Sequence, residues 1–150
     1  CNEISYEILT AYDLTFNSSV YEQLSSQLNV NIRTAIEEDL IQEMADFTLM
    51  VPWHRQITTN LVNHIRGWIY VGRVTESPDY VHYAYKYIQD VVTNFSFARD
   101  GIFGEGTSYA VTFFTTLGDV FTPFEGYSDP PGYTSDVTNL HLENPLNVLL

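Results

Sequence analysis

Cysteine is nearly absent from this sequence, and basic side chains are scarce. The 150 residues hold one cysteine, Cys1, and six lysines and arginines against 19 acidic residues, for a formal net charge of −13. One cysteine cannot form an internal disulfide, so a disulfide-stapled fold is excluded. The scarcity of bases argues against nucleic acid as a partner, because neutralising phosphates requires clustered lysines and arginines.

Long apolar runs are also missing. No stretch approaches the roughly 20 apolar residues of a membrane-spanning helix, so no membrane span is predicted. The sequence begins at Cys1 without an initiating methionine, which is typical of a processed product or a fragment. A second interpretation is a mature bacterial lipoprotein, in which a lipidated cysteine becomes the first residue.

What the sequence does contain is enough apolar surface for a core. Apolar residues make up 45% of the chain and aromatic residues 15%, and the length suits one ordinary domain. Apolar periodicity predicts helices over residues 4–16, 20–28, 57–72, 78–92 and 108–121, and a longer one that begins at Ile32 and is ended by Pro52. Ser77-Pro78-Asp79 is a strong helix start, with a cap, an early proline and an early acid. The aromatic and β-branched residues of 108–121 leave a strand open as a local alternative.

Charge is distributed unevenly along the chain. Residues 1–50 carry nine acids and one base, and residues 101–150 carry six acids and no base. Residues 51–100 hold five of the six bases against four acids. The total charge argues against any polyanionic partner, but the slightly positive central third leaves an acidic glycan open.

Polar side chains gather around the start of the most apolar predicted helix. They are His54, Gln56, Asn60, Asn63 and His64. Asn60 and His64 are four residues apart and therefore share one helix face. No carboxylate stands at helical spacing with them and the H-E-x-x-H pattern is absent, so no metal site and no cofactor are predicted. Ordinary polar residues near a helix start are the alternative interpretation.

A glycine-rich segment, DGIFGEG (100–106), interrupts the helical pattern. It lacks the GK[ST] ending of a phosphate loop and the G-x-G-x-x-G spacing. The glycines can form a tight turn with no further role. Alternatively, the loop allows Glu105 and Tyr109 to face a cleft.

Two segments together resemble a known family. TTNLVNHIRGWIYVG (58–72) and FARDGIFGEGTSYAVTFF (97–114) are similar to the α/α-toroid polysaccharide lyases. The loop looks most like the heparinase II/III-like branch, which includes alginate lyases and dermatan sulfate epimerase. Its D-G-x-x-x-E-G-x-x-Y element is matched in order by Asp100, Gly101, Glu105, Gly106 and Tyr109. Residues 97–103 are also similar to hyaluronate, xanthan and chondroitin AC lyases.

This resemblance implies an all-α fold in which antiparallel helical hairpins form part of an (α/α) toroid. The toroid part would span residues 1–124, followed by a loop-rich segment over 125–150. The implied activity is β-elimination on a uronate-containing polysaccharide by a secreted, periplasmic or cell-surface protein. The resemblance implies catalytic roles for Asn60, which neutralises the uronate carboxylate, for Tyr109 as acid and base, and for His54. Substrate-binding roles are expected at Gln56, Asn63, His64, Arg66 and Glu105.

Departures from the family pattern keep other interpretations open. Gln56 occupies the position of the branch's histidine, and glutamine cannot act as a base, although His54 lies two residues earlier. Full toroids exceed 150 residues and are followed by a β-sandwich, so further domains of a parent chain are expected. A non-catalytic glycan-binding or structural relative of this fold is one alternative, and an unrelated helical interaction protein is another. Lyase and epimerase outcomes are both compatible with the motif.

Overall fold

The chain folds into helices, as the apolar periodicity predicts. The computed structural model describes residues 4–50, 61–89, 107–134 and 141–142. Their helices are α1 (Tyr6–Thr15), α2 (Val20–Leu28), α3 (Ile32–Ile36), the π-helical turn η1 (Glu37–Gln42), α4 (Glu43–Met50), α5 (Leu61–Val74), α6 (Pro78–Tyr87), α8 (Thr107–Phe121) and the 3-10 turn η4 (Thr122–Phe124). Two short strands, β1 (Tyr127–Ser128) and β2 (His141–Leu142), pair antiparallel. The all-α prediction is confirmed, and the strand alternative over 108–121 is wrong.

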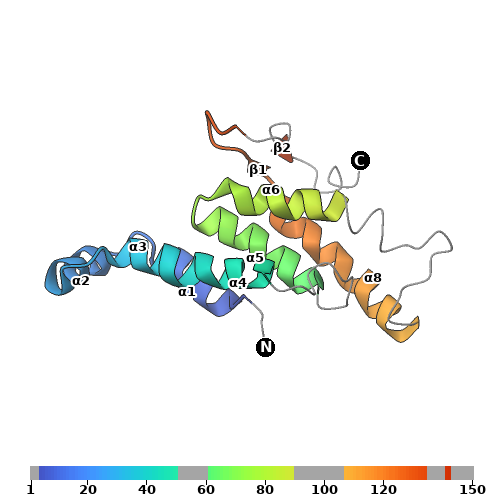
Figure 1. Cartoon of the computed structure of the whole chain (residues 1–150), viewed down its shortest axis with the longest axis horizontal. Helices are drawn as coiled ribbons and strands as arrows, with labels where there is room; N and C mark the ends of the chain where they lie inside the picture. Colours follow the sequence, from blue (N-terminus) through green and yellow to red (C-terminus); the bar gives the residue numbers. More distant parts are fainter. Residues whose placement is uncertain (1–3, 51–60, 90–106, 135–140, 143–150) are drawn as a thin grey trace.

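Helix α5 is the centre of the molecule. It packs against α1, α4, α6 and α8. Along the chain α4, α5 and α6 alternate in direction, so that α5 and α6 form an antiparallel hairpin (Figure 1). α2 and α3 lie at the far end of the long axis, away from this centre. Within the described ranges no helix combines the length and apolarity that crossing a membrane requires.

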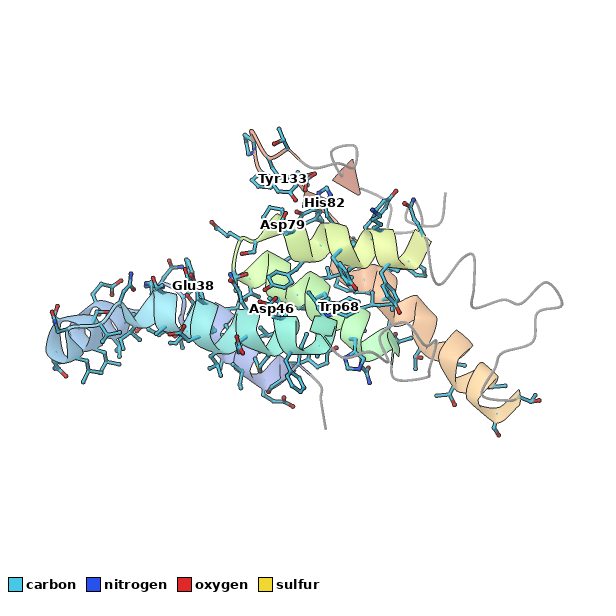
Figure 2. All side chains as sticks on the ribbon, viewed as in Figure 1. Glu38, Asp46, Trp68, Asp79, His82 and Tyr133 are labelled. Atoms are coloured by element: carbon cyan, nitrogen blue, oxygen red, sulfur yellow. The ribbon has the colours of Figure 1, made fainter. Side chains whose placement is uncertain are left out.

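The core is built on the apolar stripe of α5. Ile65, Trp68 and Ile69 have no exposed surface, and each such side chain contributes about 1.5–3 kcal/mol through burial. Trp68 lies between α4 and α6 (Figure 2). Its indole Nε1 donates to Thr48 Oγ1 at 2.7 Å, so the polar edge of this ring is satisfied inside the core.

Two glycines allow other segments to approach α5 closely. A Cβ on Gly67 would lie 2.5 Å from Cδ1 of Ile4, in the segment that leads into α1. A Cβ on Gly72 would lie 2.9 Å from the carbonyl oxygen of Ser77 and 2.7 Å from Cγ2 of Val81. The tight α5–α6 turn therefore requires glycine at position 72.

The helix predicted between Ile32 and Pro52 is present as far as Met50, but the π-helical turn η1 divides it. A π turn inserts extra backbone into a helix and shifts the face of the residues that follow. Ile41 within this turn, and Ala45 and Thr48 after it, are buried at helical spacing. The Tyr12 hydroxyl donates to the Glu37 carboxylate and fastens the start of η1 to α1.

The segment after α8 folds back over the α5–α6 hairpin. Arg73 donates from Nη1 to the carbonyl oxygens of Pro123 at 2.7 Å and Glu125 at 3.0 Å. Gly126 and Gly132 have φ angles of 68° and 86°, which glycine adopts without strain. Residues 122–134 thus lie against the α5–α6 turn, and within this range only η4 is helical.

Candidate functional site

Four of the eight predicted site residues lie outside the described residues. These are His54 and Asn60, predicted to be catalytic, and Gln56 and Glu105, predicted to bind substrate. Tyr109 belongs to the first turn of α8, but its side chain also lies outside the description. Whether Asn60 and Tyr109 share one groove therefore stays a prediction. The structure does describe three predicted substrate-binding residues, Asn63, His64 and Arg66, all on α5.

The helices that carry this group begin at the same end of the molecule. α5 starts at Leu61, directly after Asn60, and α8 starts at Thr107, two residues before Tyr109. α5 and α8 pack on each other and run in a similar direction (Figure 1). Their C-terminal ends meet where Arg73 binds the carbonyl of Pro123. The first turns of both helices therefore point their backbone N–H groups toward the same end of the bundle.

His64 faces the core. Its residue is 7% exposed, and its ring stacks at 6.4 Å between centroids on the ring of Trp68. Trp68 in turn makes edge-to-face contacts with Tyr83 at 4.9 Å and Tyr87 at 5.6 Å. Burial raises the pKa of Tyr87 to about 12, with a smaller contribution from Tyr83. A substrate-binding role for His64 stays a prediction, and its described environment is an aromatic cluster.

Arg66 faces α1 rather than the aromatic cluster. Its guanidinium carbon lies 5.2 Å from the centroid of the Tyr6 ring, within the range of a cation–π contact. The Tyr6 hydroxyl donates to the backbone carbonyl of Asn63 at 2.9 Å. Asn63, His64 and Arg66 are therefore close in sequence but do not converge on one point. Arg66 lines a cavity between α1 and α5 that sequence reasoning did not foresee.

A second polar cluster, also unforeseen, joins α6 to the C-terminal segment. His82 Nε2 lies 2.7 Å from Asp129 Oδ1, and both side chains are almost fully buried. The Tyr127 hydroxyl donates to the same carboxylate oxygen at 2.9 Å, and the Tyr133 hydroxyl donates to Asp79. Figure 2 shows Asp79, His82 and Tyr133 together above α6. Burial first, and the hydrogen-bonded carboxylates second, raise the pKa of Tyr127 and of Tyr133.

The Asp129 carboxylate is the centre of this second cluster, because it binds both His82 and the Tyr127 hydroxyl. The ring of Tyr133 lies 4.9 Å from the ring of His82 between centroids. The contacts of this cluster hold residues 127–133 on α6. Because Asp129 is 47 positions from His82, no local spacing in the sequence could have revealed the pair.

The bases of the central third do not form a patch within the described ranges. Arg66 faces α1, Arg73 binds carbonyls of the C-terminal segment, and Lys86 is exposed on α6. In the part of the chain that the structure describes, no three histidine, cysteine or acidic side chains gather as a metal site would require. Described residues therefore offer one isolated cation beside a cavity rather than a basic surface.

Comparison with protein-family models, with curated proteins and with solved structures finds no match for this chain, so the resemblance to the toroid lyases rests on its sequence motifs.

Proposed function

We propose that this chain is the helical part of an α/α-toroid polysaccharide lyase that cleaves a uronate-containing polysaccharide by β-elimination. The observation that carries the proposal is the common origin of α5 and α8 at one end of the bundle. Asn60 directly precedes α5, and Tyr109 belongs to the first turn of α8. The alternating directions of α4, α5 and α6 support the toroid architecture, because a toroid is built from antiparallel helical hairpins.

In this proposal the chemistry begins with the uronate carboxylate. Asn60 donates a hydrogen bond to it, which stabilises the enolate that forms when the C5 proton leaves. Tyr109 or His54 accepts that proton, and the electron pair of the C–H bond forms the C4–C5 double bond. The C4–O4 bond breaks, and Tyr109 gives a proton to the departing O4. Gln56 can support the carboxylate as a donor but cannot act as the base.

The test is the ultraviolet absorbance of the unsaturated uronate product, measured on heparin, chondroitin, hyaluronan and alginate with the full-length protein that carries this chain. We expect one of these polymers to be cleaved, and Tyr109→Phe and Asn60→Ala each to lower kcat/KM by about a hundredfold or more. Asn17→Ala, in an exposed turn between α1 and α2, is the matched control and keeps full activity. Absence of product from all four polymers, or full activity in Tyr109→Phe, would refute the proposal.

A non-catalytic glycan-binding relative is the second candidate. Gln56 stands where the lyase branch has its histidine, and the described bases are dispersed over separate faces. This candidate predicts saturable binding of an acidic oligosaccharide without formation of a double bond. Calorimetric titration alongside the absorbance assay separates the two candidates.

A further inference from the structure

A groove of about 410 Å³ runs between α1 and α5. α1 contributes Tyr6, Thr10 and Asp13 to its lining, and α5 contributes Arg66 and Tyr70. Its volume lies in the range typical of small-ligand sites. The wall combines two tyrosines, several aliphatic side chains, one threonine, one cation and one carboxylate, which is a composition suited to an amphipathic ligand.

The cation of this groove has no anionic partner among the described residues. Arg66 is half-buried, and no described carboxylate or carbonyl accepts a hydrogen bond from it. Its Nε is buried, so only the two outer nitrogens of the guanidinium can reach a ligand in the groove. Arg33 is paired with Glu22, and Arg73 with backbone carbonyls. Arg66 differs from both, because no described group accepts a hydrogen bond from it. The guanidinium fork matches the geometry of a carboxylate or a phosphate, and a uronate supplies the carboxylate.

The aromatic wall beside Arg66 is fixed before any ligand binds. Tyr6 is held by its hydrogen bond to Asn63 and by an edge-to-face contact with Tyr70, whose centroid is 5.7 Å away. Such rings offer a flat apolar surface to the C–H face of a sugar, and a preformed surface loses little entropy on binding.

The carboxylate of the groove lies at the other end from Arg66. Tyr6 contacts Arg66, and Asp13 follows seven residues later on the same helix, which places it about 10 Å farther along the axis. An anion at the Asp13 end would meet a like charge, whereas the hydroxyl groups of an uncharged sugar could donate to that carboxylate. Arg66 itself is five residues beyond Leu61, about 7.5 Å from the start of α5 that follows Asn60.

We propose that the α1–α5 groove binds a disaccharide in which an acidic sugar alternates with an uncharged one, with the uronate carboxylate on Arg66 and the uncharged sugar beside Asp13. This inference rests on the proposed function for its choice of a sugar ligand. It goes beyond that function by selecting an alternating polymer, of the hyaluronan type, over a polyuronate of the alginate type. A polyuronate carries a carboxylate on every unit, so one of them would face Asp13.

The experiment is calorimetric titration of the Tyr109→Phe protein, in which cleavage of the ligand is blocked, with hyaluronan and mannuronate oligosaccharides of equal length. We expect the hyaluronan oligosaccharide to bind about two- to tenfold more tightly. Asp13→Asn should remove this preference by raising the affinity for the mannuronate oligosaccharide. Arg66→Gln weakens both ligands by more than about tenfold, and Lys86→Gln, exposed on α6, changes neither.

Equal or tighter binding of the mannuronate ligand by the protein with Asp13 would overturn the inference, as would unchanged affinities in a folded Arg66→Gln protein. If Arg66→Gln does not fold, the exposed Asp13→Asn substitution still decides the question. Binding that depends on Arg66, with no unsaturated product from any polymer, would support ligand binding in the groove and refute the lyase activity. Cleavage of a polymer, together with affinities that do not change when Arg66 or Asp13 is substituted, would support the lyase activity and refute ligand binding in the groove.

Discussion

Helices α2 and α5 carry the same kind of apolar stripe, but only one of them is buried. Val20, Leu24 and Leu28 stand four residues apart on α2 and are 51%, 37% and 60% exposed. On α5 the stripe that includes Ile65 and Ile69 has no exposed surface. α2 packs mainly against the short α3, whereas α5 is surrounded by four helices. An apolar stripe therefore predicts a helix, and tertiary contacts decide whether the stripe becomes core.

Truncating one side chain in each helix tests this difference in burial most directly. Trp68→Ala removes the largest buried side chain of α5 and should lower the free energy of unfolding by about 3–5 kcal/mol. Leu28→Ala on α2 is the matched control and should change it by less than about 0.5 kcal/mol. Urea unfolding followed by circular dichroism measures both. A loss of similar size in both variants would show that α2 is buried in solution.

The buried half of the molecule also includes the C-terminal segment. Asp129→Ala removes an acceptor of both His82 and Tyr127 and should lower the free energy of unfolding by about 2–3 kcal/mol, because two buried polar groups each lose a hydrogen bond. Asp119→Ala, exposed on α8, is the control and should have little effect. Limited proteolysis provides a second readout, with faster cleavage within residues 122–134 in Asp129→Ala alone. Equal stability of the two variants would place this segment outside the cooperative fold.

Local patterns predicted the helices well. The Ser77-Pro78-Asp79 signal gives the start of α6 correctly, although the Ser77 hydroxyl accepts a hydrogen bond from Gln42 rather than capping the helix. The interruption by η1 of the helix predicted between Ile32 and Pro52 could not be predicted, because it depends on where Ile41 meets the core. The central place of α5 likewise depends on contacts between distant residues, such as Arg73 with Pro123.

The candidate site was predictable only as a set of residue types. The motif selects Asn60 and Tyr109, and helical periodicity puts Asn63, His64 and Arg66 on one helix. Neighbouring positions on a helix face different directions, however, so His64 meets Trp68 while Arg66 meets Tyr6. A second stripe on α5, Arg66, Tyr70 and Val74, has the spacing of a helix face and is the signal that could have indicated the groove.

Two helical glycines, one in close contact with a neighbouring segment and one in open space, provide a further test of buried and exposed surfaces. Gly72→Ala places a Cβ against the backbone of the α5–α6 turn and should destabilise the protein by about 1–3 kcal/mol. Gly118→Ala on α8 meets no atom within 4 Å and should stabilise the protein by about 0.5–1 kcal/mol, because alanine favours the helix. Thermal unfolding of the two variants should therefore shift the midpoint in opposite directions. A shift of the same sign in both would contradict the close approach of Ser77 to α5.

The smallest effect at neutral pH is expected from two buried tyrosines whose hydroxyls differ in one respect. Burial raises the pKa of both Tyr12 and Tyr87 to about 12, but the Tyr12 hydroxyl donates to Glu37, whereas no described group is a partner of the Tyr87 hydroxyl. Tyr87→Phe should therefore leave the stability at pH 7 unchanged or raise it by up to about 1 kcal/mol, while Tyr12→Phe should lower it.

The pH dependence of these two variants follows from the direction of the shift. A tyrosine with a raised pKa in the folded state stabilises it fully below its unfolded pKa of about 10, and that contribution is lost as the pH rises through the folded value. Unfolding titrations should show the wild-type protein losing stability between about pH 10 and pH 12, and Tyr87→Phe losing less over the same interval. Identical alkaline profiles for the wild type and Tyr87→Phe would mean that this hydroxyl reaches water, and the aromatic cluster around Trp68 would then be open rather than closed.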